Sequence, residues 1–153
     1  MELNPLTALS PIDGRYARQT DALRDIFSEC AFMNARVRVE VEWLISLSEA
    51  GFAELPHLSD HGKAFLRGLA DNFSLADCEA IKEIEKTTNH DVKAVEYWIK
   101  NQVAHDEELK SASEFVHFSC TSEDINNTSH AIMLKRGREA LADYLQQIHD
   151  TIA

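Results

Sequence analysis

Residues 28–51, SECAFMNARVRVEVEWLISLSEAG, predict the fold class of this chain. Between residues 28 and 50 the apolar side chains recur mostly at steps of three and four, the spacing that places them on one face of an α-helix. Gly51 follows, and glycine is common just beyond the C-terminus of a helix. The pattern predicts one long helix whose buried face is formed by Ala31, Met33, Val37, Val41, Leu44, Ile45 and Leu47.

The composition of the 153 residues favours an all-α fold. Five glycines and three prolines impose few obligatory turns on a chain of this length, which leaves room for long helices. Hydrophobic residues make up 44% and charged residues 27% of the chain, a balance typical of folded globular proteins rather than of disordered or membrane-spanning ones. The length is sufficient for one domain, or for a domain and the start of another.

Several further helices are expected on either side of a polar break at residues 88–90. Ser59 can cap one helix, and the sequence Ser-Leu-Ala-Asp at residues 74–77 is similar to a capping box that begins the next. Thr121 is the expected N-cap of a last helix that continues to the end of the chain. Residues 104–114 are polar and acidic, and we expect them to form a connection.

The net charge argues against one class of binding partner, and the cysteines indicate the cellular compartment. The net charge of -11 disfavours binding to nucleic acid, whose phosphates repel an acidic surface. No apolar run approaches the roughly 18 residues of a membrane span, and no secretory signal is expected at the N-terminus. Cys30, Cys78 and Cys120 are odd in number, far apart and outside any C-x-x-C motif. This arrangement favours a reducing compartment, the cytoplasm, over a disulfide scaffold or a zinc site.

Three polar clusters, at residues 13–16, 88–91 and 121–124, lie where helices are expected to begin or end. Free backbone N–H groups at such ends can bind a carboxylate or a phosphate. In the first cluster Gly14 permits close approach of the backbone, and Arg15 and Tyr16 offer a planar donor group and a hydroxyl or ring. Each cluster also has a purely structural interpretation, as a turn or a helix cap, so the residues alone leave both interpretations open.

Two histidines are candidates for proton transfer. His90 lies between Asn89 and Asp91, where a carboxylate can favour the charged ring, although a partly exposed histidine at a helix cap explains the position equally well. His117 lies between two apolar residues, which favours a hydrogen-bonded core histidine. The sequence contains no H-E-x-x-H, Walker, G-x-G-x-x-G or G-x-S-x-G motif, so neither a metal site nor the nucleotide and acyl chemistry of those motifs is expected.

Residues 10–16 (SPIDGRY), 85–96 (EKTTNHDVKAVE) and 115–127 (FVHFSCTSEDINN) together resemble the adenylosuccinate lyases, most closely their bacterial branch. The order and spacing of the three segments match over nearly the whole chain. The resemblance implies the all-α fold of the fumarase/aspartase superfamily. Residues 1–110 would then form the helical N-terminal domain and residues 111–153 the beginning of the central long-helix bundle.

The resemblance also implies a carbon–nitrogen lyase of purine biosynthesis. Such an enzyme eliminates fumarate from adenylosuccinate, giving AMP, and from the succinylated aminoimidazole carboxamide ribonucleotide, by general acid–base catalysis without a cofactor. It works as a cytoplasmic homotetramer that binds small nucleotides, not nucleic acid or membranes. The family's serine base, on an S-S-x-M-P-x-K-x-N-P loop, and its principal general-acid histidine, in a T-H-G-Q segment, have no counterpart in these 153 residues. The chain alone is therefore expected to be inactive.

Carried over residue by residue, the resemblance assigns roles to all three clusters. His90 and His117 would be catalytic. Ser119 and Asn89 depart from the pattern of many members, which have glycine and arginine at these positions. The substrate-binding residues would be Arg15, Tyr16, Asn89, His90, Asp91, Thr121 and Ser122.

Two other functions compete with this interpretation. The amphipathic helices alone favour a non-catalytic helical module for binding or assembly. Another lyase of the superfamily, such as argininosuccinate lyase, is the second alternative. The apolar pattern of the last helix continues to its end without a capping residue, as expected for part of a longer element. If that face is left uncovered it should be adhesive; it comprises Leu141, Leu145, Ile148 and Ile152.

Overall fold

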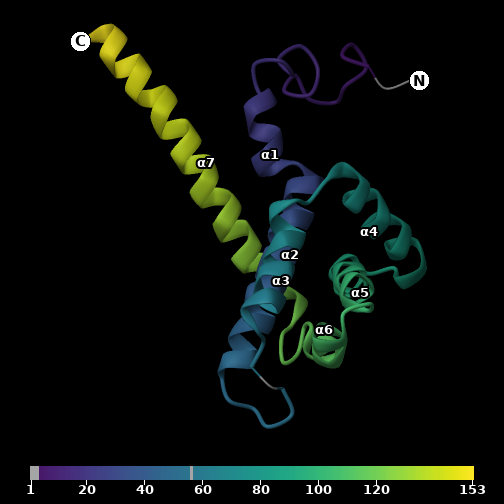
Figure 1. The fold of residues 1–153 in the computed structure, drawn as a ribbon. Helices are drawn as coiled ribbons and strands as arrows, with labels where there is room; N and C mark the ends of the chain where they lie inside the picture. The colour runs from purple at the N-terminus through teal and green to yellow at the C-terminus, as the bar shows by residue number, and fades with distance from the viewer. Residues whose placement is uncertain (1–3, 56) are drawn as a thin grey trace.

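The computed structural model describes residues 4–55 and 57–153, and these residues form an all-α fold without strands (Figure 1). Met1, Glu2 and Leu3, which belong to the stretch expected to hold no secretory signal, lie outside the described residues, as does Pro56. The α-helices are α1 (Arg24–Phe27), α2 (Glu29–Glu49), α3 (Asp60–Asp71), α4 (Leu75–Thr88), α5 (Asp91–Val103), α6 (Glu107–Ala112) and α7 (Ser122–Ile152), and the 3₁₀ turns are η1 (Asp21–Leu23) and η2 (Ser113–Phe115).

Helix α2 is the central element and matches the helix predicted from the sequence. Ser28 Oγ caps it by accepting the N–H of Ala31 at 3.1 Å. After the helix, Gly51 adopts φ 82°, in the left-handed region that favours glycine. Because α2 packs against α1, α3, α4, α5 and α7, it forms the framework to which the other helices are fixed.

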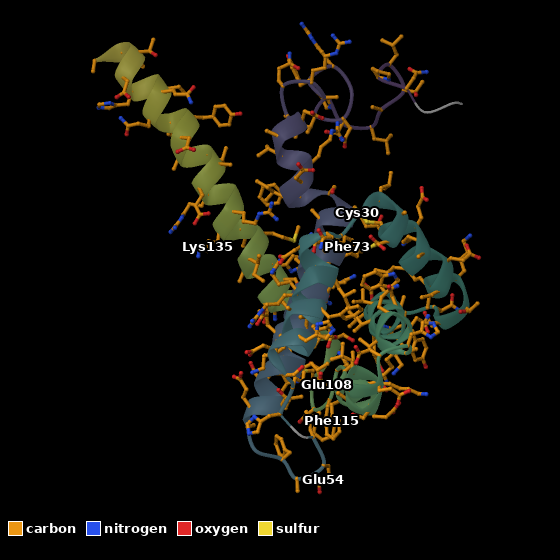
Figure 2. The ribbon with its side chains drawn as sticks, viewed as in Figure 1. Cys30, Glu54, Phe73, Glu108, Phe115 and Lys135 are labelled. Carbon is orange, nitrogen blue, oxygen red and sulfur yellow. A yellow bond between two sulfur atoms is a disulfide. The ribbon has the colours of Figure 1, made fainter. Side chains whose placement is uncertain are left out.

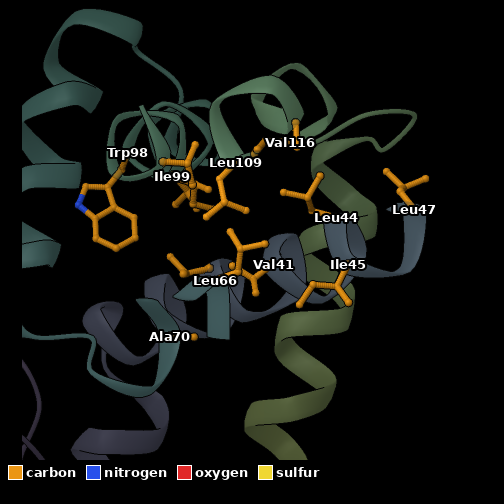
Figure 3. Close-up of a cluster of buried hydrophobic side chains, with 14 of the residues drawn as sticks. Val41, Leu44, Ile45, Leu47, Leu66, Ala70, Trp98, Ile99, Leu109 and Val116 are labelled. Atoms are coloured by element: carbon orange, nitrogen blue, oxygen red, sulfur yellow. The ribbon is translucent and has the colours of Figure 1, made fainter. Parts of the chain in front are cut away.

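The hydrophobic core lies between α2, α3, α4, α5 and α6, and Figure 3 shows part of it. Val41 and Leu44 of α2 belong to one cluster with Leu66 of α3 and Ile99 of α5, and all four side chains are fully buried. Complete burial of one such side chain contributes about 1.5–3 kcal/mol relative to leaving it in water. Side chains from α6 close the cluster. The core therefore fixes α5 against α2, the contact on which the candidate site depends.

Capping boxes confirm two of the predicted helix starts. Ser74 N–H donates to Asp77 Oδ2 at 2.8 Å at the start of α4. Thr121 N–H donates to Asp124 Oδ2 at the same distance at the start of α7. The amide and hydroxyl of Thr121 lower the pKa of Asp124, because both hydrogen bonds favour the ionised carboxylate.

The prediction of a simple connection at residues 104–114 is wrong, because α6 occupies Glu107–Ala112. Asp106 Oδ1 caps this helix by accepting the N–H of Leu109 at 2.9 Å. Leu109 and Ala112 are buried in the core, so tertiary packing stabilises a helix too short to persist alone. The expected domain boundary between residues 110 and 111 falls inside α6.

The cysteine pattern favoured a reducing compartment over a disulfide scaffold, yet the structure pairs two of the three cysteines. Cys30 on α2, labelled in Figure 2, forms a disulfide with Cys78 on α4, with 5.7 Å between the two Cα atoms, whereas Cys120 is free. The two partners are 48 residues apart in the sequence. Their proximity comes from the packing of α4 on the first turn of α2, and cysteine spacing carries no signal of that packing.

Residues 4–20 and the second half of α7 are largely exposed to solvent. Residues 4–20 form turns without a helix, as expected from their prolines and glycine. The second half of α7 projects beyond the core helices, and its apolar residues Leu141, Leu145, Ile148 and Ile152 are exposed (Figures 1 and 2). Within residues 4–55 and 57–153, no helix has both the length and the apolar character that crossing a membrane requires.

Candidate active site

His90 occupies the break between α4 and α5. Asn89, the C-cap of α4, adopts φ 48°, which turns the chain before α5 begins. His90 is the N-cap of α5, and its ring Nδ1 accepts the backbone N–H of Lys93 at 3.1 Å. A ring nitrogen that accepts a hydrogen bond carries no proton, so the proton of the neutral imidazole lies on Nε2. The helix cap therefore selects the tautomer of His90.

The Nε2 atom of His90 lies 3.4 Å from Ser122 Oγ, in the first turn of α7. With the proton on Nε2, the imidazole is the donor and the hydroxyl oxygen the acceptor. Both side chains are partly exposed, so a bound molecule can reach the pair. The structure thus brings together two of the three sequence clusters, although these residues are 32 positions apart.

The N-termini of α5 and α7 face the same region, because their N-cap residue and first residue, respectively, form the His90–Ser122 contact. Each terminus carries partial positive charge, which favours anions, while side-chain caps already accept the N–H groups of Val92, Lys93 and Asp124. Thr121 uses its hydroxyl and amide within the capping box of α7. Of the predicted hydroxyl pair, Ser122 is the member that contacts His90.

Arg36 is a buried arginine of α2 that connects these two helix starts. Its Nη2 donates to Asp91 Oδ2 at 2.5 Å, and its Nε donates to Asn126 Oδ1 at 2.9 Å. Partial burial by itself raises the pKa of Asp91, but the Val92 N–H and the Arg36 guanidinium outweigh it, so the pKa lies below its ordinary value. Asp91 is therefore ionised and already held by Arg36 at neutral pH.

His117 pairs with a second buried charged residue of α2. His117 follows η2, and its backbone adopts φ 64°, in the left-handed region. Its ring Nδ1 lies 2.6 Å from Glu40 Oε1. Burial raises the pKa of Glu40, opposed by the hydrogen bond and charge of His117. The other oxygen, Oε2, is buried and has no hydrogen-bond partner among the residues that the structure describes. The contact fixes one ring nitrogen of His117 and leaves Nε2 on the opposite side of the ring.

Arg15 and Tyr16 lie on the N-terminal arm, away from this pair. Tyr16 N–H donates to Pro11 O at 2.8 Å, and the Arg15 guanidinium lies 5.4 Å from the centre of the Tyr16 ring. Both side chains are exposed. A side chain on Gly14 would come within 2.7 Å of Pro5 O, so the turn requires glycine at this position.

The arm is distant from Ser122 along α7. It leads into α1, where Phe27 packs against Gly137, fifteen residues beyond Ser122. At 1.5 Å per residue, this separation along the helix is about 22 Å. The structure therefore brings His90 and Ser122 together, with Asn89, Asp91, Thr121 and His117 in neighbouring segments, but it does not bring Arg15 and Tyr16 to them.

Arg36 and Glu40 were missed by reasoning from the sequence. A signal was present, because the two charged residues are four positions apart and follow Met33 and Val37 on the buried face of α2. No metal-binding candidate adds to the site: in the described part of the chain, no group of three or more His, Cys, Asp and Glu side chains is arranged to hold a metal ion.

Comparison with known proteins gives a consistent result. The model of a family described as Lyase matches residues 14–153. Proteins called adenylosuccinate lyase from Vibrio cholerae, Haemophilus influenzae and Escherichia coli K12 are 56%, 53% and 51% identical, over 92%, 99% and 99% of this chain. The matched regions cover 31%, 34% and 34% of those proteins, so the chain spans about a third of the length of these curated relatives.

Proposed function

The chain belongs to the lyase family whose model matches residues 14–153, and from this premise we propose that the complete protein is an adenylosuccinate lyase. It would release fumarate from adenylosuccinate to give AMP, and from the succinylated aminoimidazole carboxamide ribonucleotide by the same β-elimination. The observation that carries this proposal is the identity of 51–56% to proteins of that name over more than nine-tenths of the chain.

The chemistry of the elimination matches the groups around His90. A base removes a weakly acidic proton from the carbon beside a carboxylate. The C–N bond then breaks, the double bond of fumarate forms, and a general acid protonates the departing nitrogen. Negative charge builds on the substrate before that bond breaks, and preorganised donors are usually the largest source of stabilisation. The Nε2–H of His90 and the hydroxyl of Ser122 are such donors, and the N-termini of α5 and α7 add partial positive charge.

Each predicted site residue receives a role in this proposal. His90 and His117 assist proton transfer, and the neighbouring Asn89, Asp91, Thr121 and Ser122 contact the substrate. Arg15 and Tyr16 bind the nucleotide. Because the arm is far from Ser122 within one chain, these last two residues would act in a site completed by other parts of the protein, within a homotetramer.

The remaining features of the proposal follow from the same family. The protein would work in the cytoplasm without a cofactor, on small nucleotides and not on nucleic acid. Residues 1–110 would belong to the N-terminal domain and residues 111–153 to the central bundle. In the cytoplasm, reductants keep most disulfides open, so Cys30 and Cys78 would exist there mainly as thiols.

The test is an assay of the complete protein with purified adenylosuccinate, in which AMP and fumarate are both quantified. Stoichiometric formation of the two products is expected. Argininosuccinate serves as the parallel substrate and should give no fumarate, whereas turnover of argininosuccinate alone would assign the protein to the other branch. A folded protein that cleaves neither substrate would support a non-catalytic module. Residues 1–153 alone are expected to be inactive, because the serine base and the principal general-acid histidine are absent.

A further inference from the structure

Helix α2 contributes none of the residues that the sequence assigned to the site, yet it reaches both of the helix starts that form it. We propose that Arg36 is a positioning residue, which holds the N-termini of α5 and α7 at the separation that the reaction requires. The inference rests on the proposed lyase function for its activity readout. The claim that Arg36 sets the separation of the two helix N-termini can also be tested without an activity assay.

The two hydrogen bonds of Arg36 carry the argument. Asp91, which accepts from Nη2, is the residue directly after His90. Asn126, which accepts from Nε, lies one helical turn after Ser122 on the same helix. The guanidinium is planar and its nitrogens are rigidly spaced. One side chain therefore fixes the position of α5 relative to α7, and with it the 3.4 Å contact between His90 and Ser122.

Packing holds the guanidinium itself in place. Its central carbon lies 3.9 Å from the centre of the Phe32 ring, and Phe32 stacks on His130 of α7 with 4.5 Å between ring centres. The Arg36 side chain is only 6% exposed. Since Phe32 lies one turn before Arg36 on α2, the stack and the two hydrogen bonds together restrict rotation of the side chain.

A purely stabilising role explains this arrangement less well. Burying a charge is costly, and a buried ion pair often adds no more stability than apolar side chains of similar volume. Asp91 is itself about half exposed, so the pair is not a closed unit of the core. What the arginine provides is two fixed donors aimed at two different helices, which an apolar residue or a single ammonium group does not provide.

The experiment compares Arg36→Gln, Arg36→Lys and Arg38→Gln in the complete protein. Arg38 is the matched control, because it also lies on α2 and pairs with a carboxylate, Asp71, at 2.6 Å, but on the exposed side. Arg36→Gln should lower kcat about tenfold to a hundredfold, since misplacement by about 1 Å has effects of this size, while KM changes less than about threefold. Arg36→Lys keeps the charge but not both bonds, so an intermediate kcat is expected. Arg38→Gln should match the unmodified protein.

The outcomes separate positioning from stability. A lower melting temperature with unchanged kcat in folded Arg36→Gln would overturn the inference. If that variant does not fold, Arg36→Lys and Asn126→Ala, which removes one of the two acceptors, decide by the same comparison. If the unmodified protein does not cleave adenylosuccinate, the proposed function fails. Crystal structures of the unmodified protein and Arg36→Lys then decide: a wider separation of His90 and Ser122 supports positioning, and an unchanged separation refutes it.

Discussion

The junction of α2, α5 and α7 and the N-terminal arm organise their polar residues in different ways. In the junction, contacts between distant segments hold the side chains, as in the bonds from Arg36 to Asp91 and Asn126. In the arm, Tyr16 is held by a local backbone bond to Pro11. Contacts within these residues therefore preorganise the groups around His90, whereas they do not bring Arg15 to those groups.

Substitutions in the junction and in the arm should differ most in their effects on catalysis. His90→Asn in the complete enzyme should lower kcat about 10²–10⁴-fold, because asparagine provides no proton at the position of Nε2. Asparagine is a good N-cap, so α5 should keep its stability. Arg15→Gln should instead raise KM for adenylosuccinate with a smaller effect on kcat. Steady-state kinetics and thermal melting of both variants measure this contrast, and a normal kcat in His90→Asn would remove His90 from the catalytic set.

A second contrast concerns stability, with one leucine from each region. Leu44 of α2 is 1% exposed, and Leu44→Ala should destabilise the protein by about 2–5 kcal/mol through lost burial and a cavity. Leu9 of the arm is fully exposed, and Leu9→Ala should change stability by less than about 0.5 kcal/mol. Urea unfolding of the two variants gives the comparison. Equal losses would mean that the arm is packed in the complete protein.

A third prediction uses the pH dependence of the buried Glu40. Because burial raises its pKa, the unfolded chain ionises near the ordinary value of 4.5 while folded Glu40 still binds its proton. The stability contributed by this group is therefore present at low pH and is lost as pH rises through the higher, folded pKa. The loss is about 1.4 kcal/mol for each unit by which the pKa is raised.

The variant Glu40→Gln cannot titrate and tests this directly. Its unfolding free energy should fall less than that of the unmodified protein between about pH 5 and about pH 8. Urea unfolding across this range is the measurement. Parallel curves for the two proteins would show that Glu40 has no raised pKa in the folded state.

The smallest expected effect concerns Ser119, which adopts φ 60° in the loop before α7. Ser119→Gly should stabilise the protein by about 0.5–1 kcal/mol, because glycine has no Cβ penalty in the left-handed region but loses more entropy on folding. Ser46, exposed on α2, is the matched control, and Ser46→Gly should lose about 0.5 kcal/mol in its helical position. Thermal melting should therefore give opposite signs, and a loss at both positions would contradict the strain at Ser119.

Local signals in the sequence predicted most helix ends. Ser28 and Gly51 bound α2, and Thr121 begins α7, because caps depend on neighbouring backbone groups that the sequence specifies directly. α6 was missed because its stability comes from burial of Leu109 in the core rather than from its own composition. The Cys30–Cys78 pair was missed for the same reason, since it depends on how α4 packs against α2.

The sequence supplied a prediction of which residues form the candidate site, but not of the contacts that bring His90 and Ser122 together. The residues around His90 and Ser122 were identified through the family resemblance, and the structure places those two in contact. The distance between them depends on Arg36, whose position on a buried face was visible but whose two acceptors, Asp91 and Asn126, lie 55 and 90 residues away. No local pattern encodes such contacts.

A crystal structure of the complete protein with AMP and fumarate bound would show whether His90 and Ser122 lie in the active site. We expect that fumarate or the adjoining part of the nucleotide contacts both His90 Nε2 and Ser122 Oγ. Arg15 and Tyr16, from the same or another subunit, should contact the nucleotide. Products bound in a cleft that excludes the His90–Ser122 pair would contradict this expectation.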